Sequence, residues 1–162
     1  MSNKKLDKPA PRIFIDKKGN WFQDGIPIRH RWTYIHYNSL LRRDEDGRYY
    51  VDEGTGRVYA HIEDTPFVVK MVHKRGDEFY LILNDESEEK LDFDNLWINE
   101  VNIPYTKVKV GEHDARFTRP AYYEISKYLR QEGKKFYIEF NNKKYYLQSK
   151  PKGINGPNNN IV

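Results

Sequence analysis

The apolar residues of this chain recur with two different periods, and the period changes along the sequence. Apolar side chains spaced three and four residues apart predict two amphipathic helices, over residues 32–43 and 120–131. Short apolar runs, separated by turns rich in Asp, Asn and Gly, predict β-strands elsewhere. The pattern therefore predicts an α+β fold.

The predicted strands lie before, between and after the two helices. Strand pairs flank the first helix, and a β-meander fills the middle of the chain. A last hairpin turns at Asn141–Asn142, because Asn tolerates the positive φ that a tight turn requires. The expected strands span residues 13–15, 21–22, 48–51, 58–62, 67–73, 78–83, 91–93, 96–98, 105–110, 135–140 and 143–147.

The two helical segments resemble each other. RWTYIHYNSLLR (31–42) and RPAYYEISKYLR (119–130) align without a gap, and both carry apolar residues at positions i, i+3 and i+7 of one face. The strands that follow also correspond, with one residue of drift at each turn: 48–51 with 135–138, and 57–59 with 143–145. We therefore predict two repeated helix-plus-antiparallel-strand units, although any helix followed by a hairpin would look similar.

The predicted repeat suggests a division of the chain into two packed domains and two tails. Each repeated unit is too small to be stable alone, so the two should pack together and leave a seam suited to a ligand. The ends of the chain hold little that could be buried. The expected parts are a flexible tail (1–11), an N-terminal α+β domain (12–98), a C-terminal α+β domain that repeats the first unit (99–149) and a second flexible tail (150–162).

Composition narrows the classes of protein that fit. Aromatic residues make up 15% of the chain, enough for a substantial core, and the absence of cysteine excludes disulfides and thiol catalysis. The net charge is +4, but Lys and Arg are interleaved with Asp and Glu, so we do not expect an extended nucleic-acid surface. No apolar run suits a signal peptide or a membrane span, which favours the cytoplasm.

The sequence contains no pattern that is typical of a catalytic centre. Its five histidines lack metal-ligand spacing, and no nucleophile elbow, phosphate-binding loop or dinucleotide fingerprint is present. We therefore expect no enzyme, no metal site and no cofactor. The acidic pair Glu63–Asp64 either caps a turn or belongs to a binding site, because an acid–base role would need a partner that the sequence does not show.

Two basic-aromatic segments are the best candidates for binding. Residues 116–123 and their repeat partner 29–34 combine arginines, which suit phosphate or carboxylate, with aromatic rings that can stack on a base. The alternative is that these arginines only cap and pair locally. The candidate ligand-binding residues are Arg29, Arg31, Glu63, Asp64, Arg116, Arg119, Tyr122 and Tyr123.

Four segments of the chain resemble a bacterial family, the domain of unknown function family 1285. They are DKKGNWFQDGIPI (16–28), LLRRDEDGRYYV (40–51), VYAHIEDTPFVV (58–69) and PYTKVKVGEHDARFTRPAYYE (104–124). The resemblance implies a duplicated α+β core whose second half is superficially pleckstrin-homology-like. It also implies ligand binding at the domain interface, with a nucleotide as one candidate, in bacterial signalling. The chain departs from the family's turns at residues 52–55 and 141–144.

Together these observations lead to two hypotheses about function. The first is a non-enzymatic module that binds a small anionic ligand, such as a nucleotide, between the repeated domains and acts in signal transduction. The second is an adaptor that binds nucleic acid or protein through exposed aromatic strands. The sequence does not indicate an oligomeric state.

Overall fold

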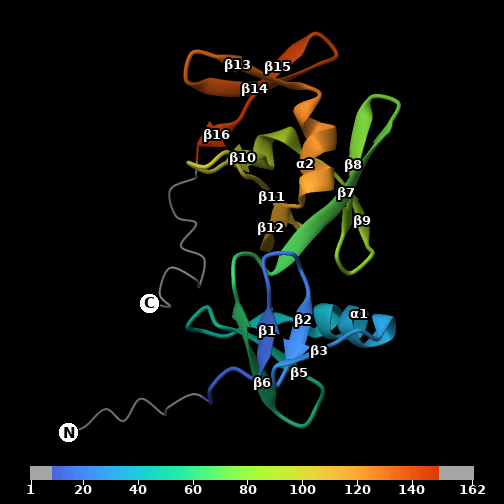
Figure 1. Ribbon diagram of the computed structural model, residues 1–162, viewed down its shortest axis with the longest axis vertical. Coiled ribbons are helices and arrows are strands. Elements are labelled where there is room, and N and C mark those ends of the chain that lie inside the picture. Colours follow the sequence, from blue (N-terminus) through green and yellow to red (C-terminus); the bar gives the residue numbers. More distant parts are fainter. Residues whose placement is uncertain (1–8, 150–162) are drawn as a thin grey trace, which may run out of the picture.

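The protein folds into three β-sheets and two α-helices, which confirms the predicted α+β class (Figure 1). A computed structural model describes residues 9–149, so the predicted tails 1–11 and 150–162 lie almost wholly outside the described residues. Sheet A occupies one half of the molecule, sheet B the middle of the other half, and sheet C the far end (Figure 1).

Sheet A contains six strands in the order β3-β2-β1-β6-β5-β4. Its β1 and β6 run parallel, and its other neighbours are antiparallel. Helix α1 (Arg31–Leu40) connects β3 to β4 and contacts β5. The strands are β1 (Ile13–Ile15), β2 (Trp21–Gln23), β3 (Ile26–Pro27), β4 (Arg42–Arg43), β5 (Tyr49–Asp52) and β6 (Arg57–Ile62).

Sheet B contains seven strands in the order β16-β10-β11-β12-β7-β8-β9. The pairs β16–β10 and β12–β7 are parallel, and the other pairs are antiparallel. A short 3-10 turn, η1 (Phe93–Asn95), separates β9 from β10. The strands are β7 (Phe67–Arg75), β8 (Glu78–Leu83), β9 (Glu88–Lys90), β10 (Trp97–Ile98), β11 (Pro104–Val108), β12 (His113–Phe117) and β16 (Gln148–Ser149).

Sheet C is a three-stranded antiparallel sheet that follows helix α2. Helix α2 (Arg119–Ser126) begins with Pro120 in its first turn, as the sequence predicts, and packs on β7. The strands are β13 (Leu129–Glu132), β14 (Lys135–Phe140) and β15 (Lys143–Tyr146). Asn141 and Asn142 form the β14–β15 turn with φ of 51° and 59°, which confirms the expected hairpin.

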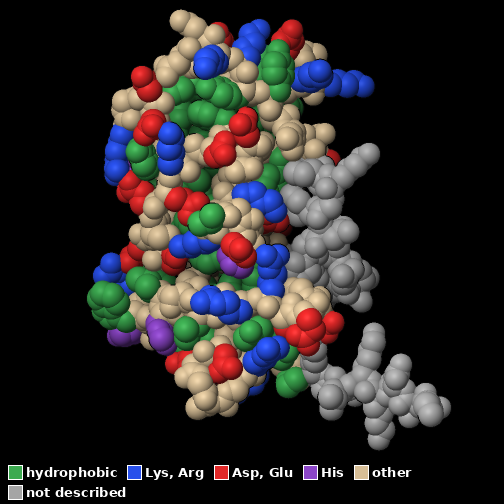
Figure 2. Space-filling view, turned by 180° about the vertical axis from the view of Figure 1, so that it is seen from behind, with side chains coloured by type: hydrophobic (Ala, Val, Ile, Leu, Met, Phe, Trp, Pro, Cys, Tyr) green, Lys and Arg blue, Asp and Glu red, His purple; other side chains and the backbone are tan. Residues whose placement is uncertain are grey.

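One apolar core connects the three sheets. Phe79, Leu81 and Leu83 are buried on one face of β8, as the period of two predicts, and they belong to the same cluster as Ile15 of sheet A and Ile138 of sheet C. The surface carries charged side chains of both signs (Figure 2). The core therefore holds sheets from distant parts of the chain together.

The seam between sheets A and B is formed by polar and aromatic contacts. The ammonium group of Lys70 on β7 donates a hydrogen bond to the carbonyl oxygen of Lys18 in the β1–β2 turn, at 2.8 Å. The hydroxyl of Tyr49 lies 3.0 Å from Nδ1 of His113, and the His113 ring also contacts Phe67. These contacts fix the position of sheet A on sheet B.

Both helices end earlier than the sequence predicted. Helix α1 stops at Leu40, and Leu41 is extended, because Arg42–Arg43 pair with β5. Residues 129–132 likewise pair with β14. The predicted helix ends were therefore wrong, since the strand ladder satisfies backbone groups that a longer helix would have bonded. Within residues 9–149, no helix is long and apolar enough to cross a membrane.

The sheets do not follow the domain boundary that we expected at residue 98. Strand β7 pairs in parallel with β12, and β10 pairs with β11, so the boundary between 12–98 and 99–149 falls inside sheet B. Sheets A and B meet instead between Ile62 and Phe67. The physical reason is that the β7–β12 pairing joins residues far apart in the chain, which a local pattern does not specify.

The same order of elements follows each helix. Strands β4, β5 and β6 follow α1, and strands β13, β14 and β15 follow α2. The first set belongs to the larger sheet A, whereas the second set forms sheet C alone. This order is consistent with the predicted repeat, which stays a prediction, as does the pleckstrin-homology-like character of the second half.

Candidate functional site

The structure brings two of the eight predicted site residues into direct contact. Nη1 of Arg116 on β12 lies 3.1 Å from Oδ2 of Asp64, in the link between sheets A and B. The hydroxyl of Tyr105 on β11 donates to the same carboxylate at 2.9 Å, and burial together with Asp64 raises the pKa of Tyr105. These contacts hold the link between sheets A and B against sheet B. They fit the alternative that the predicted arginines only pair locally.

Two more predicted residues make contacts that stabilise turns. Nε of Arg31 lies 2.5 Å from Oε2 of Glu86, in the β8–β9 turn. Oε2 of Glu63 accepts a hydrogen bond from the backbone N–H of Lys17 at 2.7 Å, in the β1–β2 turn. Both contacts connect segments far apart in the sequence.

The remaining predicted residues do not gather. The side chains of Arg29, Arg119 and Tyr123 are exposed, whereas Tyr122 is half-buried against the core. Within residues 9–149, neither Arg29 nor Arg119 forms an ion pair. A binding role for the eight residues stays a prediction, and the structure does not assemble them into one pocket.

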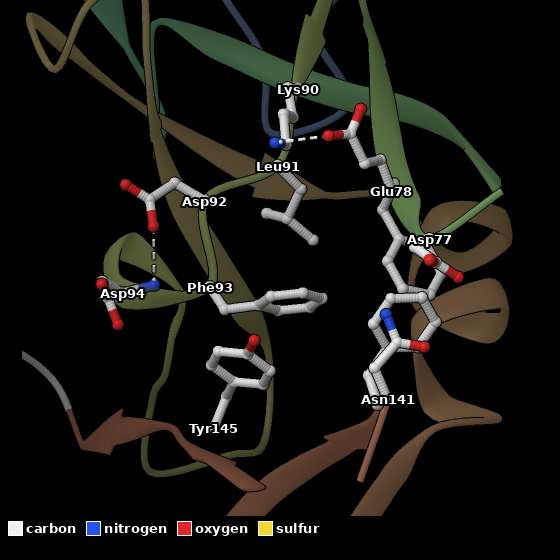
Figure 3. Close-up of a pocket in the computed structure, with 11 residues that line it drawn as sticks. Asp77, Glu78, Lys90, Leu91, Asp92, Phe93, Asp94, Asn141 and Tyr145 are labelled. Atoms are coloured by element: carbon white, nitrogen blue, oxygen red, sulfur yellow. Dashed lines mark hydrogen bonds and ion pairs between the residues drawn. The ribbon is translucent and has the colours of Figure 1, made fainter. Parts of the chain in front are cut away.

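A pocket of about 470 Å³ lies elsewhere, between sheet B and sheet C (Figure 3). One wall comes from β8, the end of β9 and η1, and the other comes from the β14–β15 hairpin. Its lining consists of Asp77, Glu78, Phe79, Lys90, Leu91, Asp92, Phe93, Asp94, Phe140, Asn141 and Tyr145. None of the eight predicted residues belongs to this lining.

The inner part of the pocket is aromatic. The rings of Phe93 and Tyr145 stack with centroids 4.7 Å apart and an interplanar angle of 25° (Figure 3). Phe79 and Phe140 pack beside them, with their ring centroids 4.9 Å apart. The pocket therefore offers flat apolar surface that comes from both sheets.

The rim of the pocket is acidic, with four carboxylates and one ammonium group. Oε1 of Glu78 lies 2.7 Å from Nζ of Lys90, and this hydrogen bond holds the pKa of Glu78 below its usual value. Asp92 caps η1 by accepting a hydrogen bond from the backbone N–H of Asp94 at 2.9 Å. The carboxylates of Asp77 and Asp94 make no hydrogen bond or ion pair with the residues that the structure describes.

The sequence contained a signal for this pocket that we interpreted differently. Residues 91–95, LDFDN, alternate apolar and acidic side chains, and we expected a strand at 91–93. The structure turns this segment into η1 after β9, because the Asp92 side chain bonds the backbone N–H of Asp94. Leu91 and Phe93 then line the pocket, and Asp92 and Asp94 lie at its rim (Figure 3). No three His, Asp or Glu side chains within residues 9–149 are arranged to hold a metal ion.

Comparison with solved structures identifies two proteins with this fold. A DUF1285 family protein from Silicibacter pomeroyi superposes with a TM-score of 0.66 and 20% identity, over 91% of this chain and 87% of that protein. A DUF1285 family protein from Shewanella baltica gives a TM-score of 0.61 and 16% identity, over 73% and 92%. No protein-family model and no curated protein sequence matches the chain. The structural likeness confirms the resemblance inferred from the sequence, at the level of the fold.

Proposed function

We propose that this protein, which shares its fold with two bacterial DUF1285 family proteins, is a non-catalytic module that binds a small molecule in the pocket between sheets B and C. The volume of about 470 Å³ falls within the usual range for ligand sites. The combination of aromatic walls with a few polar groups is also typical of such sites. This pocket is the observation that carries the proposal.

The charge of the pocket favours a cation over the anion that the sequence suggested. Four carboxylates would repel phosphate, and the one cation of the lining, Lys90, is already paired with Glu78. Asp77 and Asp94 are left to attract a positive ligand, and the faces of the Phe93 and Tyr145 rings also attract cations. The proposed ligand is an amine or guanidinium compound with a flat apolar part.

One of the two turns at which the chain departs from its family lines this pocket. Asn141 stands in the β14–β15 turn, where the resemblance implies a turn rich in Ser and Gly. A change of turn residues at a pocket wall alters the groups that a ligand meets. This position therefore supports a ligand that is particular to this chain.

The pocket also gives a physical basis for a role in signalling. Its two walls belong to different sheets, so a ligand that contacts both would favour the arrangement in which the sheets lie together. Such a preference changes the population of states without any chemical step. We therefore keep the proposal of a signalling module that acts in the bacterial cytoplasm.

A thermal-shift experiment with charge-matched ligands tests the proposal. Tyramine and 3-(4-hydroxyphenyl)propionate share one ring and carry opposite charges, and AMP and cyclic di-GMP represent the nucleotide hypothesis. We expect tyramine, at ten times its dissociation constant, to raise the melting temperature by about 3–5 °C. The propionate should not raise it.

Variants show whether the shift arises in this pocket. Asp77→Asn combined with Asp94→Asn should remove the tyramine shift, and Glu100→Gln, an exposed carboxylate outside the pocket lining, should not. The absence of a shift with any compound would reject the binding module. A shift with nucleotides that survives the double variant would restore the anion hypothesis and place its site elsewhere.

A further inference from the structure

Strand β9 forms one edge of sheet B, next to the pocket. It is the last strand in the order of the sheet, and among the residues that the structure describes it pairs only with β8. Its ladder of hydrogen bonds with β8 continues to Leu91, whose backbone N–H donates to the carbonyl oxygen of Phe79 at 2.8 Å. Lys90 and Leu91 also line the pocket. The free edge of β9 therefore leads into the pocket wall.

The backbone of this edge carries hydrogen-bonding groups that face no strand. In an antiparallel ladder, every second residue directs its N–H and C=O groups at the partner strand. Ser87, Glu89 and Leu91 are the residues of this kind, since their positions face Leu83, Leu81 and Phe79 in the hydrogen-bonded pairs. The backbone groups of Glu88 and Lys90 point the other way, and no strand within residues 9–149 pairs with them. Such an edge is a template for a further strand.

The edge and the pocket carry more acidic than basic side chains, even after the ion pairs are counted. Residues 77–94 contribute eight carboxylates and one ammonium group, that of Lys90. Three cations from elsewhere pair with this segment: Arg31 with Glu86, Arg75 with Glu88 and Lys109 with Asp85. Two more lie beside the aromatic wall, because Nζ of Lys74 is 5.3 Å from the Phe140 ring centroid and Lys143 lies opposite Phe140. With all six cations counted, two negative charges remain in excess.

The pocket at the end of this edge suits the head of an arginine side chain. Figure 3 shows Asp77 and Asp94 on opposite sides of the Phe93 ring. A planar guanidinium group can stack on an aromatic face and bond carboxylates at its rim with its several N–H groups. The compact ammonium group of a lysine has no flat face to stack. The arrangement of these groups therefore favours arginine.

We propose that this site binds an extended peptide, which adds a strand to the edge of β9 and places an arginine side chain in the pocket. This binding mode rests on the proposed function, because the arginine is the cation that the pocket takes. The backbone groups of Glu88 and Lys90 bond the peptide backbone. In strand addition, backbone hydrogen bonds supply affinity and side-chain pockets supply specificity. A free amine uses the pocket alone, so the unpaired edge beside it favours a peptide.

Titration calorimetry of the full chain with a short peptide tests both parts of this binding mode. The probe is an acetylated and amidated peptide of alternating threonine and valine with an arginine at each end, so that either strand direction brings an arginine to the pocket. Replacing both arginines with citrulline, which keeps the shape and removes the charge, should weaken binding about tenfold or more.

Backbone methylation of the same peptide tests the strand pairing. Two isomers carry N-methyl groups on alternate backbone nitrogens, so one isomer is blocked on the edge that faces β9 and the other on the edge that faces solvent. The first should bind about tenfold more weakly than the unmethylated peptide, because it loses backbone hydrogen bonds. The second should bind nearly as well.

Two variants of one residue separate the edge from its charge. Glu88→Pro removes an N–H that faces away from β8, so it should keep the β8–β9 ladder and weaken peptide binding about tenfold. Glu88→Gln removes the same carboxylate and keeps the N–H, so the affinity should change by less than about twofold. Both variants should bind tyramine like the unchanged protein, since Glu88 is not in the pocket lining. Asp77→Asn combined with Asp94→Asn should weaken both ligands.

The results distinguish failure of the peptide-binding mode from failure of the proposed function. Binding of the peptide that is tighter than binding of tyramine, and that is lost in one methylated isomer and in Glu88→Pro, supports strand addition. Tyramine binding without tighter peptide binding overturns the peptide-binding mode and leaves the amine-binding pocket in place. Equal affinity for the two methylated isomers, or for the citrulline peptide, has the same meaning. Absence of binding by both tyramine and the peptide overturns both proposals.

Discussion

Arg42 and Arg130 lie at corresponding positions after the two helices and make the same hydrogen bonds. Nη1 of Arg42 donates to the carbonyl oxygens of Ser39 and Leu41, at 3.1 and 2.9 Å. Nη1 of Arg130 donates to the carbonyl oxygens of Lys127 and Leu129, at 3.1 and 3.0 Å. Each arginine thus bonds one carbonyl group at the end of a helix, that of Ser39 or Lys127, and the carbonyl group of the residue that precedes the arginine.

The matching hydrogen bonds of the two arginines predict equal losses of stability when either arginine is removed. Arg42→Ala and Arg130→Ala should each lower the free energy of unfolding by about 1 kcal/mol, because each removes charge-assisted hydrogen bonds at a helix end. Urea unfolding followed by tyrosine or tryptophan fluorescence measures the change. Arg29→Ala, at an exposed arginine without an ion pair among the described residues, should change the stability little. A loss at only one of the two sites would argue against a shared role.

The seam between sheets A and B predicts that two glycines respond differently to the same substitution. Gly19 has φ of +81°, and a Cβ there would lie 2.5 Å from Cγ2 of Val68. Gly25 has φ of +78°, but nothing lies within 4 Å of its Cβ position. Gly25→Ala should cost about 1 kcal/mol for the left-handed backbone alone, and Gly19→Ala should cost about 1–3 kcal/mol more.

Chemical unfolding of both glycine variants provides the comparison. Gly19 and Gly25 have nearly the same φ, so the strain of a left-handed backbone is nearly the same in both variants. The difference between their free energies of unfolding therefore measures the close approach of the β1–β2 turn to β7. Equal losses would show that Val68 moves aside without cost, and that this part of the seam is loosely packed.

The lowered pKa of His113 predicts how the stability of the protein depends on pH. Its burial, and then the positive charges of Arg43, Arg42, Lys109 and Lys107, lower its pKa from 6.5 to about 4. The unfolded chain therefore binds a proton at a pH where the folded protein does not. The contribution of neutral His113 to the free energy of unfolding is fully present above pH 6.5. On the order of 2–3 kcal/mol of the free energy of unfolding is lost as the pH falls from 6.5 to 4.

The contribution of His113 can be separated from that of other groups with one variant. His113→Phe keeps a ring between Tyr49 and Phe67 and cannot be protonated, so its stability should fall less steeply between pH 6.5 and 4. Urea unfolding across this range measures both proteins, and NMR titration of the ring gives the pKa directly. Parallel profiles would assign the pH dependence to the carboxylates.

Local patterns predicted several elements closely and failed at their ends. Strand β8 was predicted at residues 78–83, because alternation marks a strand with one buried face. The residues after each helix were predicted as helical, although Arg42–Arg43 and Leu129–Glu132 pair with neighbouring strands. A pairing partner can override the preference of the last helical turn, and the local sequence does not reveal that partner.

The candidate pocket could not be predicted for the same reason. Its aromatic walls come from Phe79, Phe93 and Tyr145, which are separated by many residues and meet only because sheet C packs against sheet B. The predicted arginines were chosen for their chemistry, and the structure uses Arg116 and Arg31 in bridges to Asp64 and Glu86. The residue types indicated that these arginines would pair with acidic groups. They did not indicate that the acidic groups would belong to the protein itself.

By itself, the sequence determined the order of the two helices and of most of the longer strands, since these follow from periodicities of two and 3.6 residues, but β9, β12 and β13 were not among the expected strands. The tertiary structure decided which strands are neighbours, as in the parallel pairs β1–β6 and β7–β12. Backbone hydrogen bonds are chemically alike for every strand, so only the packing of side chains across the whole molecule selects the partner. That selection placed aromatic rings and carboxylates together in the pocket.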